Sequence, residues 1–220
     1  MINGAIFDVD GTLLDSMKIW DEAAAKYLAG LGIAAEKNLA EILFDMSLDE
    51  GAHYLKNRYS LPFSEDKIKN GVLNVIENFY LYEARLKDGA KDILEFFNSN
   101  NINMIAATSS DKKQIQGAFK RLDILKFFKG IITCSEIGEG KTSPDIYIEC
   151  SKIIGTKPNN TLVFEDALFA LKTAKNAGFK TVAVFDESSK KDTSAIKGIC
   201  SYYAESLEDA ANWGHHLLSL

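Results

Sequence analysis

Short apolar runs, each ending in a polar residue, recur along the chain and alternate with amphipathic stretches of helical length. Runs of this kind are typical of buried strands, and the stretches between them have the spacing of helices. The alternation predicts an α/β fold, a doubly wound parallel sheet covered by helices on both faces. The predicted strands cover residues 5–7, 104–107, 131–133, 162–164 and 182–185, and the predicted helices lie near residues 90–98, 111–121, 144–154 and 167–177.

Residues from about 15 to 85 interrupt this alternation. They contain no clear strand, and their apolar residues follow helical spacing in three stripes. We therefore expect an all-helical insert after the first strand, placed above the sheet as a cap, with an ordinary long crossover as the alternative. The stripes consist of Trp20, Ala23, Ala24, Tyr27 and Leu28, then Leu39, Ile42 and Leu43, then Ile68, Val72, Val75, Ile76, Phe79 and Tyr80.

Composition excludes several classes of protein. The net charge of -6 argues against a general nucleic-acid surface, which needs a basic face. No apolar stretch approaches the ~20 residues of a membrane helix, and no basic-then-apolar leader precedes the first predicted strand. Cys134, Cys150 and Cys200 are far apart and lack metal-ligand spacing. We therefore expect a cytoplasmic protein, monomeric or weakly homo-oligomeric, that binds neither nucleic acid nor membranes.

The first predicted strand ends in two carboxylates, Asp8 and Asp10, followed at once by Gly11 and Thr12. The glycine lets the backbone approach a ligand closely. Such a carboxylate pair can bind a divalent cation and leave one carboxylate free to attack phosphorus. The alternative for Asp8 is a solvated aspartate in a turn.

Polar residues also follow the other predicted strands. Thr108 follows the strand over 104–107, Glu165 and Asp166 follow the strand over 162–164, and Asp186 follows the last one. In open parallel sheets, ligands bind outside the carboxyl ends of the strands. The pattern therefore predicts that these side chains lie at a ligand-binding edge.

Four separated motifs, in this order, resemble those of the haloacid dehalogenase superfamily, in the branch whose helical cap is inserted after the first strand. The resemblance covers essentially the whole chain. It implies a core domain formed by residues 1–14 and 86–220 and a helical cap domain formed by residues 15–85. The motifs are Asp8-x-Asp10-Gly11-Thr12, Thr108 with Ser109 and Ser110, Lys141 with Pro144 and Asp145, and the acidic pair Glu165-Asp166.

The resemblance implies a hydrolase of phosphoric monoester bonds that acts on a small phosphorylated metabolite through an aspartyl-phosphate on Asp8. Asp10 is implied as the acid that protonates the leaving oxygen and the base that then activates water. Dehalogenase members lack this second aspartate and need no metal, so its presence favours phosphoryl chemistry. Thr108 and Lys141 are implied as catalytic residues, and together with Ser109 they are expected to bind the substrate.

The resemblance also implies Mg²⁺ as the cofactor. The expected ligands are side-chain oxygens of Asp8 and Asp166 and the backbone carbonyl of Asp10, with Glu165 binding directly or through water. For two of the phosphate-binding candidates a local role is the alternative: Thr108 as a helix N-cap and Lys141 as an ordinary loop lysine.

Departures from the family pattern bear on the reaction and the substrate. Trp20 stands where β-phosphoglucomutase-like members carry a histidine, which favours hydrolysis. A sugar phosphomutase and a catalytically silent protein that binds a phosphometabolite remain the alternatives. Cap positions expected to face the substrate lie near Trp20 and within residues 44–56, including Met46, Ser47 and Glu50.

Overall fold

The computed structural model describes residues 1–208 and 210–220. The chain divides into two units, which are described separately here. One comprises Met1–Asp15 and Ala84–Leu220, and the other comprises Ser16–Glu83.

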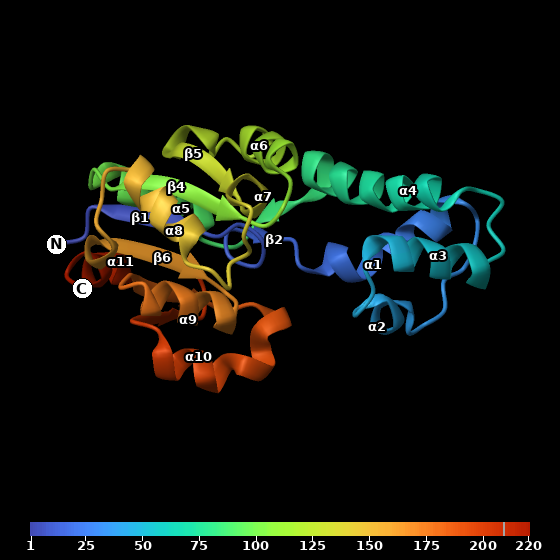
Figure 1. Cartoon of the computed structure of the whole chain (residues 1–220). Helices are drawn as coiled ribbons and strands as arrows, with labels where there is room; N and C mark the ends of the chain where they lie inside the picture. Colours follow the sequence, from blue (N-terminus) through green and yellow to red (C-terminus); the bar gives the residue numbers. More distant parts are fainter. Residues whose placement is uncertain (209) are drawn as a thin grey trace. The chain divides into compact units, whose positions relative to one another are not determined.

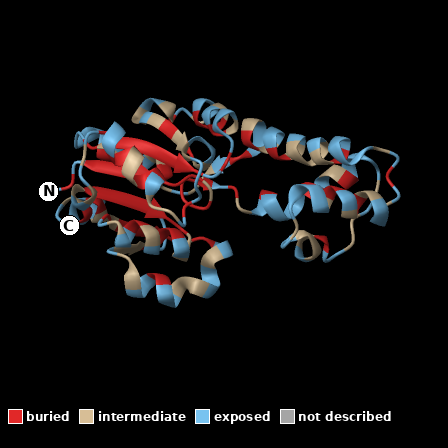
Figure 2. Ribbon diagram, viewed as in Figure 1, coloured by how far each residue is buried: buried red, intermediate tan, exposed pale blue. Residues whose placement is uncertain are grey.

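The first unit is built on a six-stranded sheet in the order β5-β4-β1-β6-β7-β8 (Figure 1). Every neighbouring pair of strands in this sheet is parallel, and the central strands are almost entirely buried (Figure 2). A separate antiparallel pair, β2 with β3, flanks the point where the second unit is inserted. The strands are β1 (Gly4–Phe7), β2 (Leu14–Asp15), β3 (Arg85–Leu86), β4 (Asn103–Thr108), β5 (Phe128–Thr133), β6 (Thr161–Glu165), β7 (Lys180–Val184) and β8 (Tyr202–Ala204).

Helices cover both faces of this sheet, because successive strand residues point to opposite sides. Ile6 of β1 packs in a cluster with Ile146 and Tyr147 of α8. The next residue, Phe7, lies 6.1 Å from the ring of Phe97 in α5. The helices of this unit are α5 (Ala90–Ser99), α6 (Lys112–Arg121), α7 (Cys134–Ile137), α8 (Asp145–Ile153), α9 (Leu168–Asn176), α10 (Thr193–Ile199) and α11 (Ala210–Leu218), with 3₁₀ turns at Leu125–Phe127, Pro158–Asn160 and Glu187–Asp192.

The predicted fold class is confirmed: a parallel sheet, doubly wound, with a helical insert. All five predicted strands are present, and the four predicted helices correspond to α5, α6, α8 and α9. Strands β8, β2 and β3 were not predicted. These strands have three, two and two residues, which is too short for a pattern of alternating polar and apolar residues to stand out.

The second unit is entirely helical. Its core is formed by α1, α2, α3 and α4 around Leu28, Leu55 and Ile68. Two of the predicted stripes lie in α1 and α2, although Trp20 of α1 is 47% exposed. The third stripe runs through α4 into a π-helix that contains Phe79 and Tyr80. The elements are α1 (Lys18–Gly30), α2 (Leu39–Leu43), α3 (Leu48–Arg58), α4 (Glu65–Asn78) and the π-helix η1 (Phe79–Glu83).

Helix α3 was not predicted, because its sequence is mostly polar and only Ala52 and Leu55 are buried in it. A capping box begins this helix: the Ser47 hydroxyl accepts from the backbone N–H of Glu50, and the Glu50 carboxylate accepts from that of Ser47. Among the described residues, none of the helices combines the length and the apolar character that a membrane span requires.

Candidate active site

Three neighbouring strands of the sheet end beside one another, and each carries or precedes a predicted site residue. Strands β4, β1 and β6 are adjacent and parallel, so their carboxyl ends meet at one edge. Thr108 ends β4, Asp8 follows β1, and Glu165 ends β6 just before Asp166. The backbone N–H of Asp8 donates to the carbonyl of Phe164 at 2.9 Å. This bond extends the pairing of β1 with β6 as far as Asp8.

The chain turns sharply after Asp8. The backbone N–H groups of Leu13 and Leu14 both donate to the carbonyl of Val9, at 2.9 and 2.8 Å. Gly11 lies inside this turn with φ of 81°, a left-handed conformation that strains residues with a Cβ. The glycine in the motif is therefore required by the backbone of the turn.

Lys141 lies in the loop between α7 and α8 and reaches the same edge. Its ammonium group donates to Asp8 Oδ1 and to Glu165 Oε1 at 2.8 Å. The hydroxyl of Tyr147, in α8, donates to the same Glu165 oxygen at 2.7 Å. All four side chains are buried. One buried chain of hydrogen bonds thus connects the end of β1, the end of β6, the loop and α8. Lys141 is therefore not an ordinary exposed loop lysine.

The electrostatics of this group are dominated by burial. Loss of water, together with the nearby Glu165 carboxylate, raises the pKa of Asp8 well above its usual value. Burial, followed by the carboxylates of Glu165 and Asp186, raises the pKa of Asp166 to about 7. Burial by itself would lower the pKa of Lys141, but the charges of Asp8 and Glu165 outweigh it and the net shift is upward. These shifts of pKa favour the charged form of Lys141 and the neutral forms of Asp8 and Asp166.

The three carboxylates of Asp8, Glu165 and Asp166 form the group best suited to hold a metal ion. Each offers an oxygen, and these oxygens lie within 4.8 Å of one another. With Lys141 among them, three ionised carboxylates leave two negative charges uncompensated, which is the charge that a divalent cation supplies. Oxygen ligands of this kind suit Mg²⁺, so the donor set and its charge fit the ion that the sequence implies.

Thr108 is fully buried, and its hydroxyl accepts from the backbone N–H of Ser110 at 3.0 Å. It does not cap the following helix. Asp111 is the N-cap of α6, because its carboxylate accepts from the backbone N–H groups of Lys113 and Gln114. The N-cap alternative for Thr108 is therefore wrong for α6.

The three consecutive hydroxyl residues have different surroundings. Ser109, the predicted substrate contact, is exposed, and its hydroxyl lies 3.4 Å from the sulfur of Cys134. Ser110 is 5% exposed and donates to Asp10 Oδ2 at 2.7 Å. The structure thus places Ser110, rather than Ser109, against a predicted catalytic carboxylate.

Sequence reasoning did not assign a role to Ser110 or Tyr147. For Ser110 a signal was present: Asp111, which follows it, is a strong N-cap residue, so the helix does not need the serine hydroxyl. For Tyr147 the sequence offers only an aromatic residue on an amphipathic helix, which is typical of core packing. Its hydroxyl contact depends on how α8 lies against β6.

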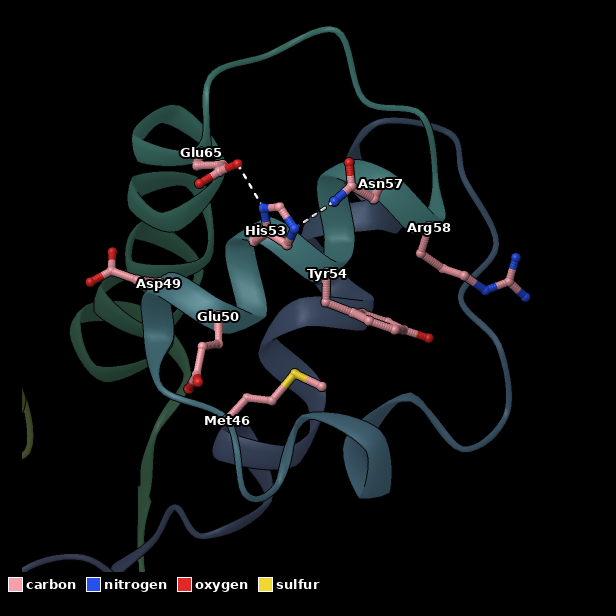
Figure 3. Close-up of a pocket in the computed structure, with 8 residues that line it drawn as sticks. All are labelled: Met46, Asp49, Glu50, His53, Tyr54, Asn57, Arg58 and Glu65. Atoms are coloured by element: carbon pink, nitrogen blue, oxygen red, sulfur yellow. Dashed lines mark hydrogen bonds and ion pairs between the residues drawn. The ribbon is translucent and has the colours of Figure 1, made fainter.

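The predicted substrate-facing positions Trp20, Met46, Ser47 and Glu50 lie in the helical unit. A cavity of about 770 Å³ in that unit is lined by Met46 and Glu50 among others (Figure 3). His53 lies at this cavity between Glu65 and Asn57, with ring nitrogens 3.0 Å and 2.9 Å from their side chains. Other polar groups of the lining are also engaged within the helical unit: Glu50 with Ser47, and Asp49 with Lys69 at 2.5 Å.

Comparison with known proteins identifies the family of this chain. A family model described as haloacid dehalogenase-like hydrolase matches residues 5–184. A phosphorylated carbohydrates phosphatase of Thermotoga maritima is 25% identical over 181 residues, covering 82% of this chain and 84% of the relative. A probable pseudouridine-5'-phosphatase of Drosophila melanogaster is 27% identical over 210 residues, covering 91% of this chain and 90% of the relative.

A solved structure described as a putative beta-phosphoglucomutase from Thermotoga maritima has the same fold. It superposes with a TM-score of 0.84 at 22% sequence identity, covering 99% of this chain and 100% of the other. At this level of identity, the likeness establishes the fold alone.

Proposed function

The chain belongs to the haloacid dehalogenase-like hydrolases, and we propose that it is a Mg²⁺-dependent phosphatase of a small phosphorylated metabolite. The observation that carries the proposal is the convergence of Asp8, Lys141, Glu165 and Asp166 in one buried group. Thr108 ends the adjacent strand β4. Two named relatives are phosphatases, which supports the same reaction class.

In the proposed reaction Asp8 is the nucleophile. Its carboxylate attacks the phosphoryl group, and the bond from phosphorus to the leaving oxygen breaks. Asp10 gives its proton to that oxygen, then takes a proton from the water that hydrolyses the aspartyl-phosphate. Lys141 holds the Asp8 carboxylate through its ammonium group, and together with Thr108 it binds the phosphoryl oxygens.

The metal is proposed to be held by Asp8, Asp166, the backbone carbonyl of Asp10, and Glu165 directly or through water. When bound, Mg²⁺ supplies positive charge that offsets the repulsion between a carboxylate nucleophile and an anionic substrate. We propose that the helical unit, Ser16–Glu83, acts as a cap that keeps bulk water away from the bound substrate and contacts its leaving group.

A screen of phosphate release tests this function. Wild-type protein with Mg²⁺ is incubated with phosphorylated sugars, nucleotides and short acids, and free inorganic phosphate is measured. Sugar phosphates come first, because one relative is named for phosphorylated carbohydrates. We expect Mg²⁺-dependent release from at least one substrate. Conversion of a hexose phosphate without net phosphate release would instead identify a mutase.

The variant Asp8→Asn separates the covalent scheme from other forms of hydrolysis. We expect a loss of at least about ten-thousandfold in kcat, as for other enzymes whose nucleophile is removed. Asp92→Asn, at an exposed aspartate in α5, is the matched control and should keep wild-type turnover. Metal-dependent hydrolysis that persists in Asp8→Asn would reject the aspartyl-phosphate.

A further inference from the structure

Ser110 makes a contact that its local structure does not require. The N-cap of α6 is Asp111, whose side chain already accepts the backbone N–H groups of the first turn. The hydroxyl of Ser110 instead crosses to the turn after β1 and donates to Asp10 Oδ2 at 2.7 Å. The side chain is 5% exposed. A buried hydroxyl held against a carboxylate 100 residues away in the sequence belongs to the site and not to the helix.

We propose that Ser110 is the positioning residue of Asp10, an inference that rests on the acid/base role proposed above. An ionised carboxylate only accepts hydrogen bonds, so Ser110 is the donor and Oδ2 is the acceptor. In a carboxylic acid, the carbonyl-type oxygen is the better acceptor. Ser110 therefore fixes the orientation of the Asp10 carboxyl group through Oδ2, and in the proposed reaction Oδ1 carries the proton that moves to the leaving oxygen.

This arrangement separates two tasks at the site. Thr108 and Lys141 bind the phosphoryl group whatever the leaving group is. In the first step, the Asp8–phosphorus bond forms as the ester bond breaks, and the proton of Asp10 Oδ1 moves to the leaving oxygen. The contribution of Asp10 to this step therefore depends on how strongly the leaving oxygen needs a proton. Loss of the Ser110 hydroxyl should therefore slow substrates with a basic leaving group more than those with a weakly basic one.

The test compares two substrates in Ser110→Ala. One is the sugar phosphate that the wild-type protein hydrolyses fastest, whose leaving group is an alkoxide. The other is p-nitrophenyl phosphate, whose leaving group needs little protonation. The quantity measured is kcat/KM, because it reports the steps up to formation of the phosphorylated Asp8. We expect the ratio of sugar phosphate to aryl phosphate to fall about tenfold to a hundredfold, the range that a hydrogen bond to a charged group represents.

Two further variants exclude a general structural effect. Ser188→Ala removes a bond of the same kind, from Ser188 Oγ to Asp186 Oδ1 at 2.6 Å, and should leave the ratio unchanged. Ser110→Thr keeps a hydroxyl and should restore it. Because the ratio is measured on one sample, it does not depend on the fraction of folded protein.

The outcomes also separate this inference from the proposed function. If the wild-type protein hydrolyses both substrates and Ser110→Ala slows both equally, the positioning role is overturned and the phosphatase stands. If the wild-type protein releases phosphate with Mg²⁺ from no substrate of the screen and not from p-nitrophenyl phosphate, both are overturned.

Discussion

In two regions of this molecule, a glutamate accepts hydrogen bonds from a tyrosine hydroxyl and from a basic side chain. At the sheet edge, Glu165 accepts from the Tyr147 hydroxyl at 2.7 Å and from Lys141 at 2.8 Å. In the helical unit, Glu36 accepts from the Tyr54 hydroxyl at 2.7 Å and from Arg58 at 3.1 Å. These hydrogen bonds have similar lengths in the two regions.

Burial and charge balance do distinguish them. Lys141 and Glu165 are 6% and 1% exposed, whereas Arg58 and Glu36 are 52% and 21% exposed. Around Glu36 the Tyr54 hydrogen bond, followed by Arg58, lowers the pKa of the carboxyl group. Around Asp8 and Asp166, burial raises the pKa of the carboxyl groups despite the neighbouring lysine. In the helical unit, the charge of Arg58 balances that of Glu36. At the sheet edge, the three carboxylates of Asp8, Glu165 and Asp166 have one lysine among them.

Removal of the cation in each cluster should give the largest contrast. Lys141→Met leaves Asp8 and Glu165 buried without their partner, which typically costs about 3–5 kcal/mol of unfolding free energy. Because Lys141 also binds the phosphoryl group in the proposed reaction, we expect kcat to fall at least about a hundredfold. Arg58→Met should change little, since exposed ion pairs contribute little to stability. Urea denaturation in EDTA measures the free energy of unfolding, and phosphate release measures kcat. Equal losses in Lys141→Met and Arg58→Met would contradict the expected difference between the two regions.

The second contrast is in pH dependence. Because the pKa of Asp166 is raised to about 7, the metal-free folded state binds more protons than the unfolded state from about pH 4 to 7. Asp166 should therefore lower the stability of the metal-free protein as pH rises through this range, by at most about 4 kcal/mol. The lowered pKa of Glu36 has the opposite sign and acts only in acid, where stability is lost as pH falls.

Urea denaturation in EDTA measures this slope, and it should become smaller in Asp166→Asn, which keeps only the contribution of the raised pKa of Asp8. Protons and Mg²⁺ compete for Asp166, so Mg²⁺ should bind more tightly as pH rises towards about 7 and should flatten the slope. A metal-free wild-type protein with the same slope as Asp166→Asn would show that Asp166 is not held protonated by its surroundings.

The smallest contrast concerns the two tyrosines. Tyr147→Phe removes the hydroxyl that orients Glu165 and keeps the ring, which packs 6.2 Å from that of Phe179. Loss of such a partner to a metal-ligand group typically weakens metal binding about 10- to 100-fold, and calorimetric titration with Mg²⁺ can measure this. Tyr54→Phe removes a bond of equal length in the helical unit and should bind Mg²⁺ as the wild type does. An unchanged affinity of Tyr147→Phe for Mg²⁺ would show that Glu165 does not contribute to metal binding.

Much of the fold could be read from the sequence, because strands and helices of sufficient length have local periodicity. The runs ending at Asp8, Thr108 and Glu165 identified three strands and the edge at which they meet. The very short strands β2, β3 and β8 and the polar helix α3 were missed, since their formation depends on pairing or packing with distant residues.

The residue types at the strand ends, and so the kind of chemistry available at that edge, follow directly from the amino-acid order. Which side chains touch depends on the tertiary fold. In the folded protein Ser110 donates a hydrogen bond to Asp10, Tyr147 donates one to Glu165, and Lys141 donates to both Glu165 and Asp8. Periodicity reports the environment of a residue relative to its neighbours in the chain. A contact between residues 18 to 133 positions apart depends instead on strand order, register and helix placement, which become defined only when the whole sheet is packed.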